Sequence, residues 1–256
     1  MIKPRVIILS GYGLNCEEET ALGFKLAGSV VQIVHINDLA EGIKKLGNYE
    51  IMAIPGGFSY GDDTGSGKAY ANKLNNNLKD EINEFVSKDK LAIGICNGFQ
   101  ILTQTGLVPG ALTVNDGARY LDRWVDLEIT GESPWTRGIK KLSLPIAHGE
   151  GKYFAQKKVL SGLNKSLGLA ARYIKGEICQ YQNLPANPNG SIMDIAAVSA
   201  YNGRVLGIMP HPERGMFFHH LPNWPLKKEK LIREGKPLPE YGPGFQIFKN
   251  AVRYFN

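Results

Sequence analysis

A cysteine set between two glycines is the feature of this 256-residue sequence best suited to do chemistry. Cys96 lies in the stretch 91–102, LAIGICNGFQIL, which begins as an apolar run and continues as a helix-like pattern. A tight strand-to-helix turn leaves little room beside the backbone, so Gly94 and Gly98 fit a nucleophile elbow with a reactive side chain at its apex. The positive end of the helix dipole favours a thiolate there. The alternative is a buried structural cysteine, the usual role of a lone cysteine in a strand.

A histidine and a carboxylate follow the last apolar run of the chain, in the motif PHPER (210–214). Pro212 pushes His211 towards an extended backbone, and residues two apart on an extended backbone point the same way. The carboxylate of Glu213 is therefore expected beside the imidazole, where it would select the tautomer and stabilise the imidazolium. A histidine by itself is more often structural. Together with Cys96, however, this pair predicts a Cys-His-Glu triad.

A second cysteine competes for the role of nucleophile. Cys16 stands immediately before three consecutive glutamates (17–19), where a helix is expected to begin. These carboxylates disfavour a thiolate, and flanking glycines are missing, so we rank Cys96 above Cys16. Gly11-x-Gly13 follows a predicted strand as a dinucleotide fingerprint does. Because Cys16 occupies the place of its third glycine, this signal is weak.

Two glycine-rich segments are candidate walls of a pocket. PGGFSYGD (55–62) follows a predicted strand at 51–54, and ligands of open α/β sheets bind at this end of the strands. Its two adjacent glycines exceed what a simple turn needs and would bring backbone N–H groups close to a substrate. HGEG (148–151) is either a turn or a pocket wall, and the spacing leaves both open. The segment 65–68, GSGK, does not fit a phosphate loop because Ala69 stands where Ser or Thr is required.

Strand-like and helix-like segments alternate through the first part of the chain. Short apolar runs typical of buried parallel strands occur at 5–9, 30–36, 51–54 and 91–93. Helical patterns lie between them, after Cys16, at 38–46 and at 74–85. Further strands, some of them antiparallel, are expected at 125–129, 142–146, 167–174, 192–198 and 205–209. The pattern predicts an α/β fold with a doubly wound, mostly parallel sheet and flanking helices.

Size and composition predict one domain over residues 1–256. A hydrophobic content of 43% is enough to bury a full core. The segment at about 219–244 is rich in proline and lysine, and we expect an irregular extension there. An amphipathic helix follows it at the end of the chain.

Several classes of protein are excluded by composition. No apolar run approaches the roughly 18 residues that span a membrane, so we expect neither a membrane segment nor a signal peptide. Three widely spaced cysteines form neither a disulfide framework nor a zinc pattern, which predicts a cytoplasmic location and no metal site. The net charge of +6 is dispersed along the chain. Without a basic patch interleaved with aromatic residues, we expect no nucleic-acid partner.

Five motifs together resemble the class I (triad) glutamine amidotransferases, and among these the glutaminases of phosphoribosylformylglycinamidine synthases. The motifs are PGGFSYGD (55–62), GICNGFQ (94–100), HGEG (148–151), ANPNGS (186–191) and MPHPER (209–214). The resemblance runs from about residue 5 to about residue 255 and implies the flavodoxin-like fold of that class. Two segments, Asp63 to Gly67 and 224–245, resemble the glutaminase domain of the large single-chain enzymes more than the small separate subunits. The kind of synthetase partner therefore stays open.

The resemblance implies glutamine as the substrate and a role for each residue of the site. Cys96 would attack the side-chain amide and form a cysteinyl thioester, which water cleaves to release glutamate. The backbone N–H groups of Gly57 and Asn97 would hold the oxyanion. His211 would transfer protons, oriented by Glu213. Contacts with glutamine are expected from Phe58, Ser59, Gln100 and His148.

The resemblance also implies a partner. Ammonia would pass to a large synthetase subunit that uses ATP and magnesium to convert formylglycinamide ribonucleotide to formylglycinamidine ribonucleotide in purine biosynthesis. Whether a small accessory subunit joins stays open, and no cofactor is expected on this chain. Two alternatives remain. A free-standing cysteine hydrolase of the same fold would turn over at a rate indifferent to any partner, and a non-enzymatic nucleotide-binding module built on Gly11-x-Gly13 would ignore changes at Cys96.

Overall fold

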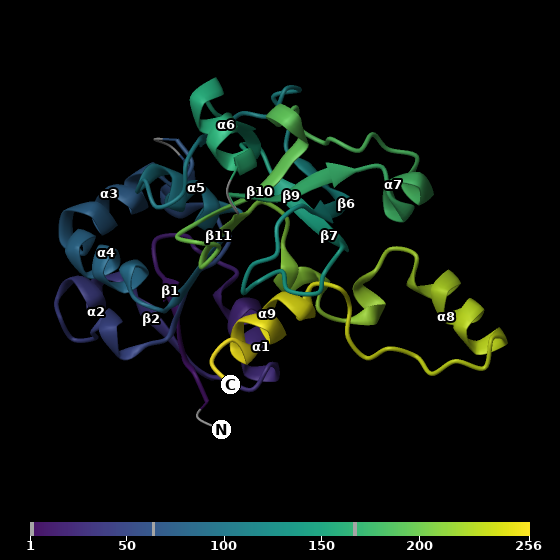
Figure 1. The fold of residues 1–256 in the computed structure, drawn as a ribbon, viewed down its shortest axis with the longest axis horizontal. Helices are drawn as coiled ribbons and strands as arrows, with labels where there is room; N and C mark the ends of the chain where they lie inside the picture. The colour runs from purple at the N-terminus through teal and green to yellow at the C-terminus, as the bar shows by residue number, and fades with distance from the viewer. Residues whose placement is uncertain (1–2, 63–64, 166–167) are drawn as a thin grey trace.

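The computed structural model describes residues 3–62, 65–165 and 168–256. Within these residues the chain is organised around a nine-stranded sheet with the order β2-β1-β3-β4-β11-β10-β9-β6-β7 (Figure 1). Its strands are β1 (Arg5–Ser10), β2 (Val30–His35), β3 (Ile51–Ile54), β4 (Leu91–Ile95), β6 (Leu121–Ile129), β7 (Lys141–His148), β9 (Leu169–Ile174), β10 (Ile195–Ala200) and β11 (Val205–Ile208). A separate antiparallel pair joins β5 (Ala111–Thr113) to β8 (Lys152–Phe154).

The first half of the sheet is parallel and doubly wound, as predicted. Strands β2, β1, β3, β4 and β11 run parallel. Every residue of β3, β4 and β11 is buried, which explains their continuous apolar sequences. Helices α1 (Glu17–Leu26) and α9 (Phe245–Arg253) pack together on one face, whereas α3 (Lys68–Asn77) and α5 (Asn97–Gln104) pack together on the other (Figure 1). The remaining helices are α2 (Ile36–Ala40), α4 (Lys79–Ser87), α6 (Lys157–Lys165), α7 (Glu177–Gln182) and α8 (Trp224–Arg233).

The second half of the sheet is antiparallel and brings its last strand back to the parallel half. Successive neighbours from β11 through β10, β9 and β6 to β7 are antiparallel, so β7 runs in the same direction as β4 and β11. The backbone N–H of His211, just after β11, donates to the carbonyl oxygen of Pro145 in β7 at 2.8 Å. The carboxyl ends of β4, β7 and β11 therefore meet in one place.

Two predicted helices differ from those of the structure. The pattern at 74–85 is two helices, α3 and α4, separated at Leu78, whose φ of −132° is not helical. The asparagines that end α3 are poor helix formers, and the break still leaves Leu78 buried. The helix expected at 38–46 is instead α2, which ends before Gly42, a residue with a φ of 74°.

Strand boundaries also shift. The strand expected at 192–198 begins at Ile195 because a short 3-10 turn occupies 192–194. The strand expected at 167–174 is β9. Its expected first residue, Leu167, lies outside the described residues, as do Asp63 and Thr64.

The segment 219–244 is not irregular throughout, and this prediction is wrong for its first half. It contains α8, which extends away from the sheet (Figure 1). Proline in a first turn costs a helix nothing, and the lysines and glutamates that follow are good helix formers, so the composition was misleading. No residue of α8, which the structure describes completely, is buried. Among the helices of the described residues, none combines the length and the apolar character that crossing a bilayer requires.

Candidate active site

Cys96 forms a strained turn between β4 and α5. Its backbone has φ 52° and ψ −106°, in the left-handed half of conformational space that a cysteine rarely adopts. A Cβ atom at Gly98 would lie 1.9 Å from the carbonyl oxygen of Ile54, and one at Gly94 would lie 2.4 Å from the carbonyl oxygen of Gly98. Both positions are closed to side chains, which confirms the predicted reason for the flanking glycines. The geometry is that of a nucleophile elbow.

His211 and Glu213 lie side by side as predicted, but the segment is extended only at His211, because a short 3-10 turn occupies Pro212–Gly215. The backbone of His211 is extended, and its Nδ1 lies 2.5 Å from Oε1 of Glu213. Both side chains are buried, 2% and 1% exposed respectively. With the carboxylate accepting from Nδ1–H, the other ring nitrogen, Nε2, is left for proton transfer. Within the described part of the chain, Nε2 makes no hydrogen bond.

The electrostatic surroundings favour the charged form of His211. Burial alone would lower the pKa of this imidazole. The Glu213 carboxylate, then the charge of Cys96 and the nearby thiols of Cys16 and Cys96, outweigh burial and raise the pKa of His211 well above 6.5. The Cys96 thiol also points at the carbonyl oxygen of Ala147 in β7, with Sγ and O 3.7 Å apart. The raised pKa of His211 keeps a positive charge on the imidazole near Cys96.

The two predicted oxyanion donors lie on neighbouring segments, the glycine loop after β3 and the first turn of α5. Gly57 faces Leu14 in an isolated antiparallel bridge, and the bridge bonds are made by the neighbouring residues Phe58 and Asn15. Asn97 is the first residue of α5. Across the described residues, neither the Gly57 N–H nor the Asn97 N–H donates to a protein acceptor. Both N–H groups are therefore available to an oxyanion formed at the elbow.

The side chains of Asn97 and Gln100 are already engaged inside the protein. Asn97 accepts from the backbone N–H of Ser59 at 3.2 Å and donates to Gln100 Oε1 at 2.7 Å. Gln100 in turn donates to the carbonyl oxygen of Glu150 at 2.7 Å. This chain of bonds ties the elbow helix to the glycine loop and to the turn after β7. Contacts of glutamine with Gln100 and with the buried Ser59 stay predictions.

An aromatic pair lies beside the elbow. Phe58, a predicted glutamine contact, is 42% exposed and tilts against Tyr120, with ring centroids 6.0 Å apart. Partial burial, then the charge of Cys96, raises the pKa of Tyr120, while the charges of Arg214 and His211 lower it. The phenol therefore lies within electrostatic range of the nucleophile and the base. Sequence reasoning missed Tyr120 because the segment around it has no periodic pattern.

His148 is held in one tautomer by a buried asparagine. Asn115 Oδ1 accepts from His148 Nδ1 at 3.2 Å and from the backbone N–H of Gly151 at 3.0 Å. The Asn115 amide donates to the carbonyl oxygen of His148 at 2.9 Å. Burial, followed by the charge of His211, lowers the pKa of His148 to about 3. His148 is therefore neutral, and its predicted contact with glutamine stays a prediction.

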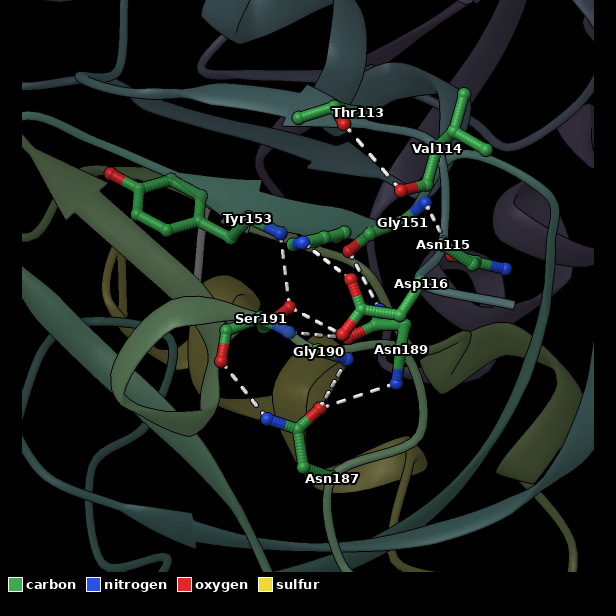
Figure 2. A network of polar contacts seen from close by, with 11 residues as sticks. Thr113, Val114, Asn115, Asp116, Gly151, Tyr153, Asn187, Asn189, Gly190 and Ser191 are labelled. Carbon is green, nitrogen blue, oxygen red and sulfur yellow. Dashed lines mark hydrogen bonds and ion pairs between the residues drawn. The ribbon is translucent and has the colours of Figure 1, made fainter. Parts of the chain in front are cut away.

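A wider polar network supports the same turn, and Figure 2 shows it. Asn189, from the ANPNGS motif, donates to the carbonyl oxygen of Gly151 at 2.8 Å, and its own carbonyl oxygen accepts from Asp116 N–H at 3.1 Å. Ser191 Oγ accepts from Tyr153 N–H at 3.0 Å. The motif, to which the resemblance attached no role, thus fixes the end of the turn at Gly151, the start of β8 at Tyr153 and the segment at Asp116.

The rival cysteine also lies at this site. Cys16 Sγ lies 3.0 Å from Nη2 of Arg214, and Sγ, a ring nitrogen of His211 and a carboxylate oxygen of Glu213 all lie within 4.8 Å of one another. Among the described residues, Cys16, His211 and Glu213 form the cluster whose sulfur, nitrogen and oxygen atoms could bind a metal ion. The guanidinium beside the sulfur repels a further cation. The role of His211 and Glu213 in proton transfer stays a prediction.

The glycines near Cys16 serve packing rather than nucleotide binding. A Cβ at Gly11 would lie 2.4 Å from Nε2 of His35, and one at Gly13 would lie 2.5 Å from the carbonyl oxygen of Phe58. Helix α1 then begins with three glutamates, which repel a phosphate. The feature that supported a nucleotide-binding module therefore has a different explanation.

Comparison with known proteins agrees with this geometry. A family model described as the CobB/CobQ-like glutamine amidotransferase domain matches residues 3–255. The phosphoribosylformylglycinamidine synthase subunit PurQ of Methanococcus maripaludis strain C7 is 46% identical over 271 residues, covering 100% of both chains. The subunit of the same name from Dehalococcoides mccartyi is 41% identical, covering 99% of this chain and 98% of its own. A chain in the structure of PurLQS from Thermotoga maritima has a TM-score of 0.74 and 30% identity, with 100% of both chains covered.

The two curated relatives are named as subunits of a synthase. The segments 63–67 and 224–245 had instead resembled the large single-chain enzymes. The prediction of a glutamine amidotransferase related to phosphoribosylformylglycinamidine synthases is confirmed by the family match and by both full-length relatives. This chain belongs to the family of CobB/CobQ-like glutamine amidotransferases.

Proposed function

We propose that this chain is the glutaminase subunit of a phosphoribosylformylglycinamidine synthase. The observation that carries the proposal is the meeting of a strained cysteine elbow with a buried His-Glu pair: Cys96 at φ 52°, and His211 with Glu213 at 2.5 Å. The names of the curated relatives, which match over the whole chain, support the choice of synthase.

The first half of the reaction forms a thioester. The Cys96 thiolate attacks the side-chain amide carbon of glutamine, and a C–S bond forms as the carbonyl oxygen becomes an oxyanion. The N–H groups of Gly57 and Asn97 stabilise that charge. His211 then gives its proton to the amide nitrogen, the C–N bond breaks and ammonia leaves. Glu213 keeps the imidazole oriented and compensates its positive charge.

The second half returns the enzyme to its starting state. With ammonia gone, neutral His211 accepts a proton from water, and the resulting hydroxide attacks the thioester carbon. The C–S bond then breaks, releasing glutamate and restoring the Cys96 thiolate beside the imidazolium. Protons balance, since the one given to ammonia is recovered from water.

The partner completes the activity. Ammonia passes to a large synthetase subunit that uses ATP and magnesium to form formylglycinamidine ribonucleotide, and this chain supplies neither group. A small accessory subunit belongs to the proposed complex, because the solved relative comes from PurLQS. A cytoplasmic location is part of the proposal, in keeping with three cysteines that are all unpaired.

The test measures ammonia and glutamate released from glutamine by the purified chain and by Cys96→Ala. Each protein is assayed alone and with the organism's synthetase, ATP and formylglycinamide ribonucleotide. Cys179→Ala is the matched control, because that thiol is also buried but lies at the start of α7. We expect Cys96→Ala to lower glutamine-dependent synthesis by at least about 10⁴-fold and to leave synthesis from ammonium salt intact.

Two outcomes would count against the proposal. If the Cys96→Ala complex also lost synthesis from ammonium salt, the division of labour between the chains would be wrong. If release required Cys96 but ignored the loaded synthetase, the chain would be a free-standing hydrolase of the same fold.

A further inference from the structure

The proposed glutaminase reaction gives no role to the loop 11–16, which contains the Gly11-x-Gly13 motif and the second cysteine, Cys16. Its backbone is bonded to the glycine loop: the N–H groups of Asn15 and Cys16 donate to the carbonyl oxygen of Gly56 at 3.1 and 3.2 Å, and Phe58 N–H donates to the carbonyl oxygen of Gly13 at 2.9 Å. Cys16 is therefore held against the loop that carries the predicted oxyanion donor.

The side chain of Cys16 points into the site. It is 1% exposed, its Sγ accepts from Arg214 Nη2 at 3.0 Å, and its thiol donates to Asn15 Oδ1 at 3.4 Å. The same sulfur lies within 4.8 Å of a ring nitrogen of His211 and a carboxylate oxygen of Glu213. One sulfur atom thus contacts Arg214 and lies close to both members of the His211–Glu213 pair.

Gly56 makes this approach possible. A Cβ there would lie 2.7 Å from Cε1 of His211 and 3.3 Å from Sγ of Cys16. A side chain at residue 56 would therefore separate the imidazole from the sulfur. The first of the two adjacent glycines serves this contact, and the second carries the predicted oxyanion donor.

We propose that Cys16 is a positioning residue for the catalytic pair. Its sulfur anchors the Arg214 guanidinium and supports the edge of the His211 imidazole, so that ring and carboxylate keep the orientation needed for proton transfer at Cys96. The inference rests on the proposed glutaminase function for its kinetic readout, but its second readout needs no substrate.

Several charged or titratable groups face His211. They come from the chain after β11, the loop 11–16, the elbow, the end of β7 and the segment before β6: Glu213, Arg214, Cys16, Cys96, His148 and Tyr120. The nearby thiol of Cys16 is one of the contributions that raise the pKa of His211 against the effect of burial. Removing the sulfur should therefore lower the pKa of His211, so that the imidazolium loses its proton at a lower pH.

The experiment compares Cys16→Ala, Cys16→Ser and the control Cys179→Ala. Two quantities are measured: kcat and KM for glutamine in the complex with the synthetase, and the pH dependence of alkylation of Cys96 by iodoacetamide, with the labelled peptide identified by mass spectrometry. For Cys16→Ala we expect kcat to fall about 10- to 100-fold with KM little changed. We also expect the upper inflection of the alkylation profile to move to lower pH. Cys16→Ser, which keeps a donor and an acceptor, should recover most of kcat, and Cys179→Ala should change neither quantity.

The inference is overturned if Cys16→Ala leaves both quantities unchanged. It is also overturned if kcat falls without movement of the inflection, or without recovery in Cys16→Ser, because either result indicates packing alone. Should Cys16→Ala not fold, Arg214→Gln tests the same contact from its other side: kcat should again fall with KM little changed, while the inflection moves to higher pH because a cation near the imidazolium is lost. If Cys96→Ala stayed active while Cys16→Ala did not, the proposed triad itself would fail, which is a separate result.

Discussion

His211 and Glu213 form a buried pair in which Nδ1 and Oε1 lie 2.5 Å apart. The chain carries both residues within one short segment after β11, so the pair is assembled locally, yet only the fold buries it. Because burial opposes a charged imidazole while the Glu213 carboxylate favours it, the protonation state of His211 depends on its partner. The pair therefore couples stability to pH.

We predict that Glu213→Gln destabilises the fold in a pH-dependent manner. The pKa of His211 is raised in the folded state, so the stabilisation from its charged form is fully present below about pH 6.5 and is lost as pH rises through the raised pKa. The difference in Tm between wild type and variant should be largest near pH 6 and shrink towards high pH. The control is Glu229→Gln, which breaks an exposed pair with Arg233 and should change Tm little at any pH. A difference that stayed constant with pH would contradict the assigned charge.

A second prediction concerns the elbow. Gly98→Ala should destabilise the protein by about 3 kcal/mol or more, because its Cβ would lie 1.9 Å from the carbonyl oxygen of Ile54 and the backbone there cannot move freely. Gly47→Ala is the control, since a Cβ at that position meets no atom within 4 Å. Denaturant unfolding measures both. Equal stability of the two variants would show that the elbow tolerates a side chain.

A third prediction concerns the turn after β7. Asn115→Ala removes the acceptor of His148 Nδ1 and Gly151 N–H and should cost about 2–4 kcal/mol, because buried polar groups lose their partners. It should also lower kcat, since the same turn holds Gln100. Asn76→Ala, at an exposed position of α3, is the control for both measurements. If Asn115→Ala kept the kcat of the wild type, this network would not contribute to the activity of the site.

A fourth prediction follows from the exposure of α8. Ile232→Ser should change the free energy of unfolding by no more than about 0.5 kcal/mol, because that side chain is 53% exposed. Ile247→Ser, at a fully buried position of α9, should cost about 3 kcal/mol or more. Thermal unfolding of the two variants makes the comparison. A large effect of Ile232→Ser would mean that α8 packs on the body of the protein.

The sequence by itself determined the parts of the site that depend on local geometry. Gly94 and Gly98 around Cys96 predict a tight turn, which follows from backbone sterics over a few residues. The spacing of His211 and Glu213 predicts imidazole beside carboxylate, and the two do pair, although through a 3-10 turn at Pro212–Gly215 rather than a fully extended segment. The parallel strands followed in the same way from continuous apolar runs such as Ile51–Ile54. The end of the helix predicted at 38–46 was wrong, because one glycine with a left-handed backbone, Gly42, is enough to end a helix.

Only the tertiary structure decided which distant segments meet. The return of β7 to the ends of β4 and β11, the position of Tyr120 and the contact of Cys16 with Arg214 join residues far apart in the chain. Such contacts leave no periodic signal, since their energy comes from burial and pairing that exist only once the sheet has formed. For the same reason Cys16, judged from its three neighbouring glutamates, ranked below Cys96 as a candidate nucleophile, while the fold places its sulfur within 4.8 Å of His211 and Glu213 side-chain atoms.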